Sequence, residues 1–121
     1  MAKTVLVVDD SATTREMIIF ALNNAGYGVI TAVHGKDALN KLNMTTVDMV
    51  ITDIEMPVMD GTELLKQLRS GPEYRRIPVI VMLPSYQELE RQEFMLTDVD
   101  GWIVKPFAAD ELLEVIKLFM K

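Results

Sequence analysis

The sequence contains no cysteine among its 121 residues, so the fold needs no disulfide bond and no thiolate metal site. It also lacks an apolar region long enough for a signal peptide, and the run of about 20 apolar residues that a membrane helix requires. The formal net charge of -6 argues against non-specific nucleic-acid binding, which depends on a basic surface. We therefore expect a cytoplasmic protein that binds neither membranes nor nucleic acid.

The composition is that of an ordinary globular domain. Half of the residues are hydrophobic and a quarter are charged, which leaves enough apolar material for a core. No repeat, linker or low-complexity segment divides the chain. Because the length also fits one domain, residues 1–121 are predicted to form a single domain.

Short apolar runs of strand length alternate with segments of helical period. Most of these runs are continuous rather than alternating, which is typical of strands buried on both faces of a sheet. The predicted strands are Val5–Val8, Val29–Ala32, Met49–Thr52, Val79–Leu83 and Trp102–Val104. The repeated strand–helix pattern predicts an α/β fold, a five-stranded parallel sheet with helices on both faces. Gly26 is predicted to end the first helix, and a polar helix over 87–93 is predicted to lie exposed.

Charged residues follow three of these runs. Asp9 and Asp10 follow the first run, Asp53 the third and Lys105 the fifth. In open parallel sheets, ligands bind beyond the carboxyl ends of the strands, where the strand order reverses. Taken singly, Asp10 could cap a helix, Asp53 could lie in a solvated turn and Lys105 could be an ordinary surface lysine. Their joint placement at strand ends favours one shared site.

Three carboxylates and an ammonium group in one pocket suit metal-assisted phosphoryl chemistry. The carboxylates repel one another, so without a cation the pKa of at least one is expected to rise. Oxygen ligands without histidine or cysteine favour Mg²⁺, which keeps several waters and leaves positions for phosphate oxygens. An aspartate can then serve as the nucleophile and form an aspartyl phosphate, while a lysine neutralises charge on the transferring group.

Three motifs, Val7–Ser11, Asp53–Gly61 and Lys105–Phe107, closely resemble those of receiver domains of two-component response regulators. The resemblance covers essentially the whole chain and is closest to the single-domain chemotaxis (CheY-like) type. It implies a flavodoxin-like sheet with strand order 2-1-3-4-5. It also implies a phosphorelay protein that catalyses only its own phosphorylation, rather than an enzyme with a separate substrate.

The resemblance assigns a role to each residue of the site. Asp53 resembles the phosphoacceptor, and Lys105 resembles the lysine that contacts the phosphoryl group. Asp10, Asp53 and the backbone carbonyl of Glu55 resemble the direct Mg²⁺ ligands, whereas Asp9 resembles the aspartate that acts largely through metal-bound water.

The resemblance also implies partners. The phosphodonor is expected to be a histidine kinase or a small acyl phosphate. A target protein is expected on the face formed by the fourth helix, the fifth strand and the fifth helix. The Lys105–Pro106 bond is expected to be cis, as in the family.

The chain departs from the family pattern at the end of the fourth strand, where Leu83-Pro84 replaces the usual Thr or Ser followed by Ala. Leucine has no hydroxyl and proline has no N–H, so two donors to the phosphoryl group are missing. Each such bond contributes about 1.5–3 kcal/mol, unless water or Ser85 takes its place. Trp102 matches the family's switch aromatic, and with Leu83 in place we expect weak coupling between it and Asp53.

Two further interpretations stay open beside the phosphoacceptor. A degenerate receiver would be a protein-binding module that works whatever its phosphorylation state, and Leu83-Pro84 favours it. An enzyme is less well supported. Phosphohydrolases with an aspartate nucleophile need a second aspartate where this chain has Ser11, and a dinucleotide enzyme needs a glycine-rich turn after the first strand.

Overall fold

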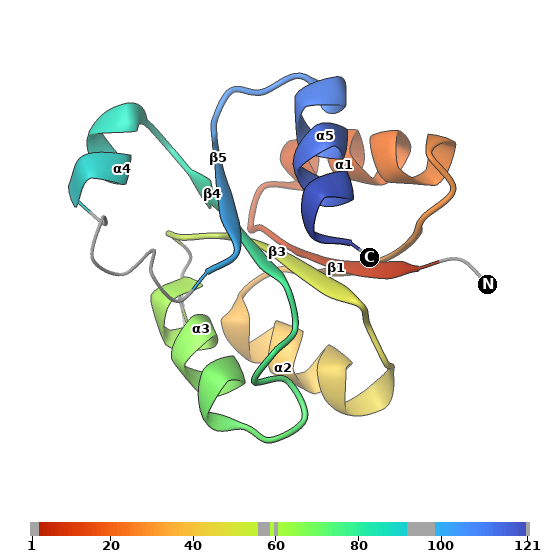
Figure 1. Cartoon of the computed structure of the whole chain (residues 1–121), viewed down its shortest axis with the longest axis vertical. Helices are drawn as coiled ribbons and strands as arrows, with labels where there is room; N and C mark the ends of the chain where they lie inside the picture. The colour runs from red at the N-terminus through yellow and green to blue at the C-terminus, as the bar shows by residue number, and fades with distance from the viewer. Residues whose placement is uncertain (1–2, 56–58, 60, 92–98, 121) are drawn as a thin grey trace.

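A parallel sheet of five strands, in the order β2-β1-β3-β4-β5, forms the centre of the molecule in the computed structural model (Figure 1). The structure describes residues 3–55, 59, 61–91 and 99–120. The strands are β1 Thr4–Val8, β2 Gly28–Ala32, β3 Met49–Asp53, β4 Val79–Leu83 and β5 Gly101–Val104. The helices are α1 Ala12–Asn24, α2 Gly35–Met44, α3 Gly61–Ser70, α4 Tyr86–Arg91 and α5 Ala109–Phe119. The predicted class, strand order and alternation are confirmed.

The strand boundaries differ from the predicted ones by one residue at several ends. The difference that matters is at β3, which extends to Asp53. Asp53 is in register with Met82 of β4, and the next N–H, that of Ile54, still donates to the Met82 carbonyl at 3.1 Å. The acidic residue is therefore the last member of a hydrogen-bonded strand and is held by the ladder.

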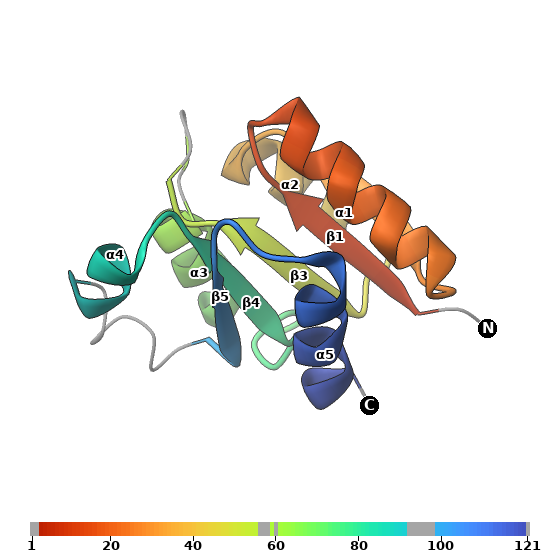
Figure 2. The ribbon, with the colours of Figure 1, turned by 90° about the horizontal axis from the view of Figure 1, so that it is seen from above.

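Helices cover both faces of the sheet, with α1 and α5 on one face and α2 and α3 on the other (Figure 2). Successive side chains of a strand point to opposite faces, so a strand covered on both sides must be apolar throughout. In β1, Val5 and Val7 belong to the core under α1 and α5, whereas Leu6 and Val8 belong to the core under α2 and α3. This explains the continuous apolar runs of the sequence.

The ends of α1 follow local signals in the sequence. The hydroxyl oxygen of Ser11 accepts a hydrogen bond from the Thr14 N–H and caps the helix. Beyond the C-terminus, Gly26 has a φ of +90°, a conformation that favours glycine, so the predicted helix stop is confirmed.

The polar segment predicted over 87–93 forms α4 from Tyr86 to Arg91, and residues 92 and 93 lie outside the described residues. Gln87 is exposed as expected, and so is Tyr86, which lies just before the predicted segment. Glu88, however, is buried, which the polar pattern did not predict.

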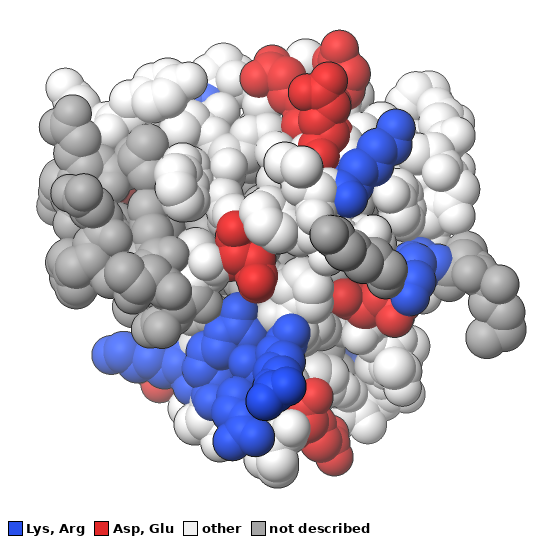
Figure 3. All heavy atoms as spheres, viewed as in Figure 1, with Lys and Arg blue, Asp and Glu red and all other residues white. Residues whose placement is uncertain are grey.

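Charge is distributed unevenly over the face shown in Figure 3. Basic side chains gather over the last turn of α3 and the turn that leads to β4, whereas acidic side chains gather over α5. Of the helices in the described part of the chain, none is both long and apolar enough to cross a membrane.

Candidate metal and phosphoryl site

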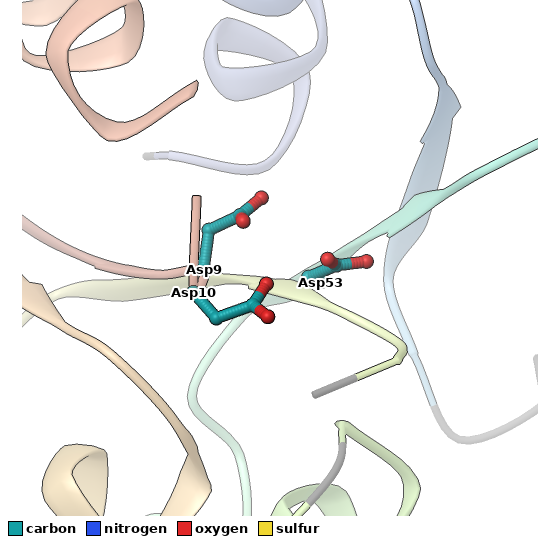
Figure 4. Close-up of side chains that lie close together, drawn as sticks. All are labelled: Asp9, Asp10 and Asp53. Carbon is teal, nitrogen blue, oxygen red and sulfur yellow. The ribbon is translucent and has the colours of Figure 1, made fainter. Parts of the chain in front are cut away.

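Three carboxylates converge at the carboxyl ends of β1 and β3, which are neighbours in the sheet (Figure 4). Oxygen atoms of Asp9, Asp10 and Asp53 all lie within 4.8 Å of one another. Asp9 and Asp53 are buried, whereas Asp10 is exposed. In the sheet, β2 lies on one side of β1 and β3 on the other. The chain passes from β1 to β2 and then crosses over to β3, so the carboxyl ends of β1 and β3 mark the point at which the strand order reverses.

Asp9 is fully buried and both of its carboxylate oxygens are engaged. Oδ1 accepts a hydrogen bond from the Ser11 N–H at 2.8 Å, and Oδ2 accepts one from Lys105 Nζ at 2.8 Å. The Asp9 carbonyl also accepts a hydrogen bond from the Arg15 guanidinium at 2.6 Å. These bonds hold the Asp9 carboxylate in a fixed orientation.

Lys105 lies between the buried acids. Its ammonium group is 2.8 Å from Asp9 Oδ2 and 3.3 Å from Asp53 Oδ2. Its backbone N–H donates to the Leu83 carbonyl at 2.8 Å, so the end of β4 fixes the start of the segment that carries the lysine. The Lys105–Pro106 bond is cis, as predicted.

The electrostatic environment shifts the pKa values of Asp53 and Lys105. Burial raises the pKa of Asp53 above its ordinary value of 3.8, the Lys105 charge opposes that rise, and Asp9 adds to it. The expected rise in the pKa of one carboxylate is therefore present, although burial contributes more to this rise than the repulsion from Asp9 does. Burial lowers the pKa of Lys105, but the bond to Asp9 and the charges of Asp53 and Asp9 together outweigh it, so the net shift is upward.

The donor set suits a hard divalent cation. With all groups ionised, the three carboxylates and Lys105 carry a formal charge of -2, which one divalent cation neutralises. Within the described residues, the Asp10 side chain makes no hydrogen bond or ion pair, so its oxygens are available. The Glu55 N–H approaches Asp53 Oδ1 at 3.4 Å, which places that peptide beside the acceptor. Oxygen ligands of this kind match Mg²⁺.

The phosphoryl-binding half of the site differs from the cation-binding half. Leu83 is fully buried and belongs to the core under α2 and α3. Pro84 is exposed and offers no N–H. The Ser85 hydroxyl oxygen accepts the Glu88 N–H at 3.1 Å and so caps α4. Ser85 is thus already engaged by the helix that follows it.

Trp102, the predicted switch aromatic, lies on β5 with 47% of its surface exposed. It pairs with Val81, and Leu83 pairs with Val104, so Trp102 and Leu83 are on the same face of the sheet. Two hollows of about 270 and 250 Å³ border Trp102, one reaching toward Lys105 and the other toward α5. Trp102 thus points outward, whereas the Leu83 side chain on the same face is buried in the core.

Two residues of the site were not singled out from the sequence. Arg15 braces the Asp9 carbonyl, and the Thr52 hydroxyl donates to the Asp53 carbonyl at 2.9 Å from a buried position. A threonine at the end of an otherwise apolar run was the available signal for the second. Arg15 carried no signal, because its contact with the Asp9 carbonyl, six residues earlier, depends on the path of the chain between β1 and α1.

Comparison with known proteins agrees with this geometry. A family model described as the response regulator receiver domain matches residues 5–117. The chain belongs to this family. The receiver domain also resembles the chemotaxis protein CheY1 of Helicobacter pylori, with 36% identity over 95% of this chain and 94% of the relative. It is 34% identical over its whole length to the phosphate regulon regulator PhoB of Escherichia coli, but it spans only about half of PhoB, 53%.

Solved structures show the same CheY-like receiver fold. The chemotaxis response regulator CheY4 of Vibrio cholerae aligns with a TM-score of 0.90 and 35% identity, over 98% of this chain and 99% of CheY4. The response regulator TrrA of Thermotoga maritima, solved in complex with Mg²⁺ and beryllofluoride, aligns with a TM-score of 0.85 and 33% identity, over 97% and 98% of the two chains. The chain is thus a two-component receiver domain with an acidic cluster suited to Mg²⁺.

Proposed function

We propose that this receiver domain accepts a phosphoryl group from a histidine kinase on Asp53 in a Mg²⁺-dependent reaction. The observation that carries the proposal is the cluster of Asp9, Asp10 and Asp53 with Lys105 bonded to two of its members. The domain spans residues 1–121, acts in the cytoplasm on no substrate but itself, and signals through protein contacts rather than through nucleic acid.

Each residue of the cluster has a distinct task in this reaction. The Asp53 carboxylate attacks phosphorus, a P–O bond forms, and the bond from phosphorus to the donor's imidazole nitrogen breaks. Asp10, Asp53 and the Glu55 carbonyl would hold Mg²⁺, and Asp9 would act on it through water. When bound, the cation neutralises charge on the phosphoryl oxygens.

Lys105 supplies the fixed positive charge of the site. Its ammonium group already contacts Asp53 Oδ2, so it needs little rearrangement to reach an oxygen of a phosphoryl group on that aspartate. Its bond to Asp9 holds it in place before the donor arrives.

Incubation with acetyl phosphate and Mg²⁺, followed by intact-mass measurement, tests the proposal. We expect the wild-type protein to gain the mass of one phosphoryl group, and neither the Asp53→Asn variant nor a sample with the metal chelated to do so. Unmodified wild-type protein in the presence of both reagents would contradict the proposal.

The second candidate function is that of a phosphorylation-independent binding module. The burial of Leu83, the missing N–H of Pro84 and the exposed position of Trp102 favour it. In this case the face of α4, β5 and α5, which exposes Tyr86, Trp102 and Leu118, presents one surface to its target in both states.

The fluorescence of Trp102, the single tryptophan, separates the two functions. Addition of beryllofluoride with Mg²⁺ is expected to leave its emission nearly unchanged if the output face is uncoupled from Asp53. A large change in emission, absent from the Asp53→Asn variant, would show that phosphorylation does drive this face.

A further inference from the structure

Asp10 is the one carboxylate of the cluster whose own side chain is not held in place. It is exposed, whereas Asp9 and Asp53 are buried, and within the described residues its oxygens accept no hydrogen bond. Its position therefore depends on the two peptide groups that flank its Cα atom. The peptide that follows Asp10 is held by its N–H, that of Ser11, which donates to Asp9 Oδ1 at 2.8 Å.

The peptide that precedes Asp10 is held by Arg15. The Arg15 guanidinium donates to the Asp9 carbonyl at 2.6 Å. Asp9 is fully buried, and a buried carbonyl needs a hydrogen-bond donor. In the part of the chain that the structure describes, no backbone N–H donates to this carbonyl, so Arg15 supplies its partner.

The backbone of Arg15 contacts the chain on the other side of Asp10. Its N–H donates to the Ser11 carbonyl at 3.1 Å, in the first turn of α1 that Ser11 caps. The same helix buries Ile18 and Leu22 in the core under α1 and α5. A single residue, anchored on a helix of the core, thus holds the backbone both before and after Asp10.

A metal ligand that is fixed in this way suits one divalent cation better than another. Mg²⁺ requires near-octahedral oxygen ligands at about 2.0–2.1 Å, whereas Ca²⁺ accepts a flexible set at about 2.3–2.6 Å. We propose that Arg15 is a positioning residue for the metal site, which fixes the Asp9–Asp10 peptide and thereby favours Mg²⁺ over Ca²⁺. This inference rests on the proposed Mg²⁺-dependent function of that site.

The Arg15→Met variant tests this inference. Methionine keeps a long side chain and a similar helix propensity but removes the guanidinium. The sign of the effect is informative, because the loss of a positive charge near the cluster would by itself strengthen the binding of either cation. The loss of a positioning contact weakens Mg²⁺ binding instead.

The matched control is Arg69→Met. The Arg69 guanidinium also donates to backbone carbonyls, those of Tyr74, Arg75 and Ile77. These carbonyls lie between α3 and β4, where the chain enters the sheet, whereas the acidic cluster lies at the carboxyl ends of its strands. Both variants therefore remove a guanidinium that holds the backbone, but only one of them acts beside the cluster.

Two readouts are measured. Competition with Mn²⁺, whose free ion is followed by electron paramagnetic resonance, gives the affinities for Mg²⁺ and Ca²⁺. The ¹⁵N relaxation of the Asp10 amide in the metal-free protein reports how firmly that peptide is held. We expect Arg15→Met to weaken Mg²⁺ binding about tenfold, to change Ca²⁺ binding by less than about threefold and to reduce the order of this amide. Arg69→Met is expected to change none of the three.

Unchanged or stronger Mg²⁺ binding in Arg15→Met, or an equal loss of both cations, would overturn the inference. If Arg15→Met folds poorly, Arg15→Lys decides the question, because it keeps the charge and loses the guanidinium geometry. Mg²⁺ affinity should then still fall more than Ca²⁺ affinity, and unchanged affinities would count against Arg15. Wild-type protein that binds no Mg²⁺ would overturn the proposed function, while the Asp10 amide would still decide whether Arg15 positions the peptide.

Discussion

Restoring a hydroxyl at the end of β4 is expected to strengthen phosphoryl binding at a cost in stability. Leu83 ends β4, its carbonyl accepts the Lys105 N–H, and it stands at the position where the resemblance to receiver domains implies a threonine or serine hydroxyl that reaches the phosphoryl group. The perturbation is Leu83→Thr. Its control is Leu83→Val, which has the same shape as threonine but carries no hydroxyl.

The two variants separate packing from hydrogen bonding. Leu83 is 0% exposed, so shortening it removes about one buried methylene and leaves a small cavity, which costs about 1 kcal/mol in either variant. The threonine hydroxyl costs about 1–3 kcal/mol more if it finds no partner in the unphosphorylated protein. A bond to a charged phosphoryl oxygen returns about 1.5–3 kcal/mol, or about a tenfold to 150-fold gain in affinity.

The assay is the affinity for beryllofluoride in the presence of Mg²⁺, measured by ¹⁹F NMR, with the fluorine atoms standing in for phosphoryl oxygens. Urea unfolding of the same samples measures the cost in stability. We expect Leu83→Thr to bind the mimic at least tenfold more tightly than Leu83→Val and to unfold at lower urea. Equal affinities of the two variants would refute the reasoning, because the hydroxyl would then contribute nothing at this position.

Three further predictions concern stability. Because the pKa of Asp53 is raised in the folded state, stability falls as pH rises above the unfolded value of 3.8. Without metal, Asp53→Asn should therefore melt at a higher temperature than the wild type at pH 7, and this difference should disappear below pH 3.8. A difference in melting temperature that does not change with pH would contradict the prediction. Mg²⁺ at tenfold its dissociation constant should stabilise the wild type by about 1.4 kcal/mol, and Asp10→Ala should remove most of that gain in thermal melts. His34→Ala should cost about 1 kcal/mol in urea unfolding and His34→Asn clearly less, because asparagine can keep the cap of α2; equal losses would argue against the cap.

The sheet was predictable because strands that are buried on both faces appear in the sequence as continuous apolar runs. A run such as Val79–Leu83 can only be a buried strand or a buried helix segment, and its length decides in favour of a strand. The site was predictable for a related reason, since a parallel sheet brings the residues after its strands to one edge. Charged residues at three of those ends could therefore be grouped before any distance was known.

Other features depend on how separate segments meet, and the sequence carries no local signal for them. The pairing of Lys105 with Asp9 at 2.8 Å and with Asp53 at 3.3 Å joins residues 96 and 52 positions apart, so it depends on how β1, β3 and β5 assemble. The burial of Glu88 depends on how a short helix lies against the sheet. The hydrogen bond from the Gly35 N–H to the Met59 carbonyl joins segments that follow β2 and β3, two strands that β1 separates in the sheet, and one glycine among six gave no reason to expect it.

The gathering of negative charge near the site has a consequence for the order in which ligands arrive. Two members of the acidic cluster, Asp9 and Asp53, contact Lys105 directly, and the acidic first turn of α5, with Asp110 and Glu111, follows Lys105 closely in the chain. Such a field attracts divalent cations and repels small anionic phosphodonors, and it extends about 8–10 Å at physiological salt. Encounter with acetyl phosphate is therefore expected to be slow until a cation is bound and to quicken with ionic strength. A phosphohistidine presented on a basic protein surface would instead be drawn in, so the same charges favour a protein donor over a small one.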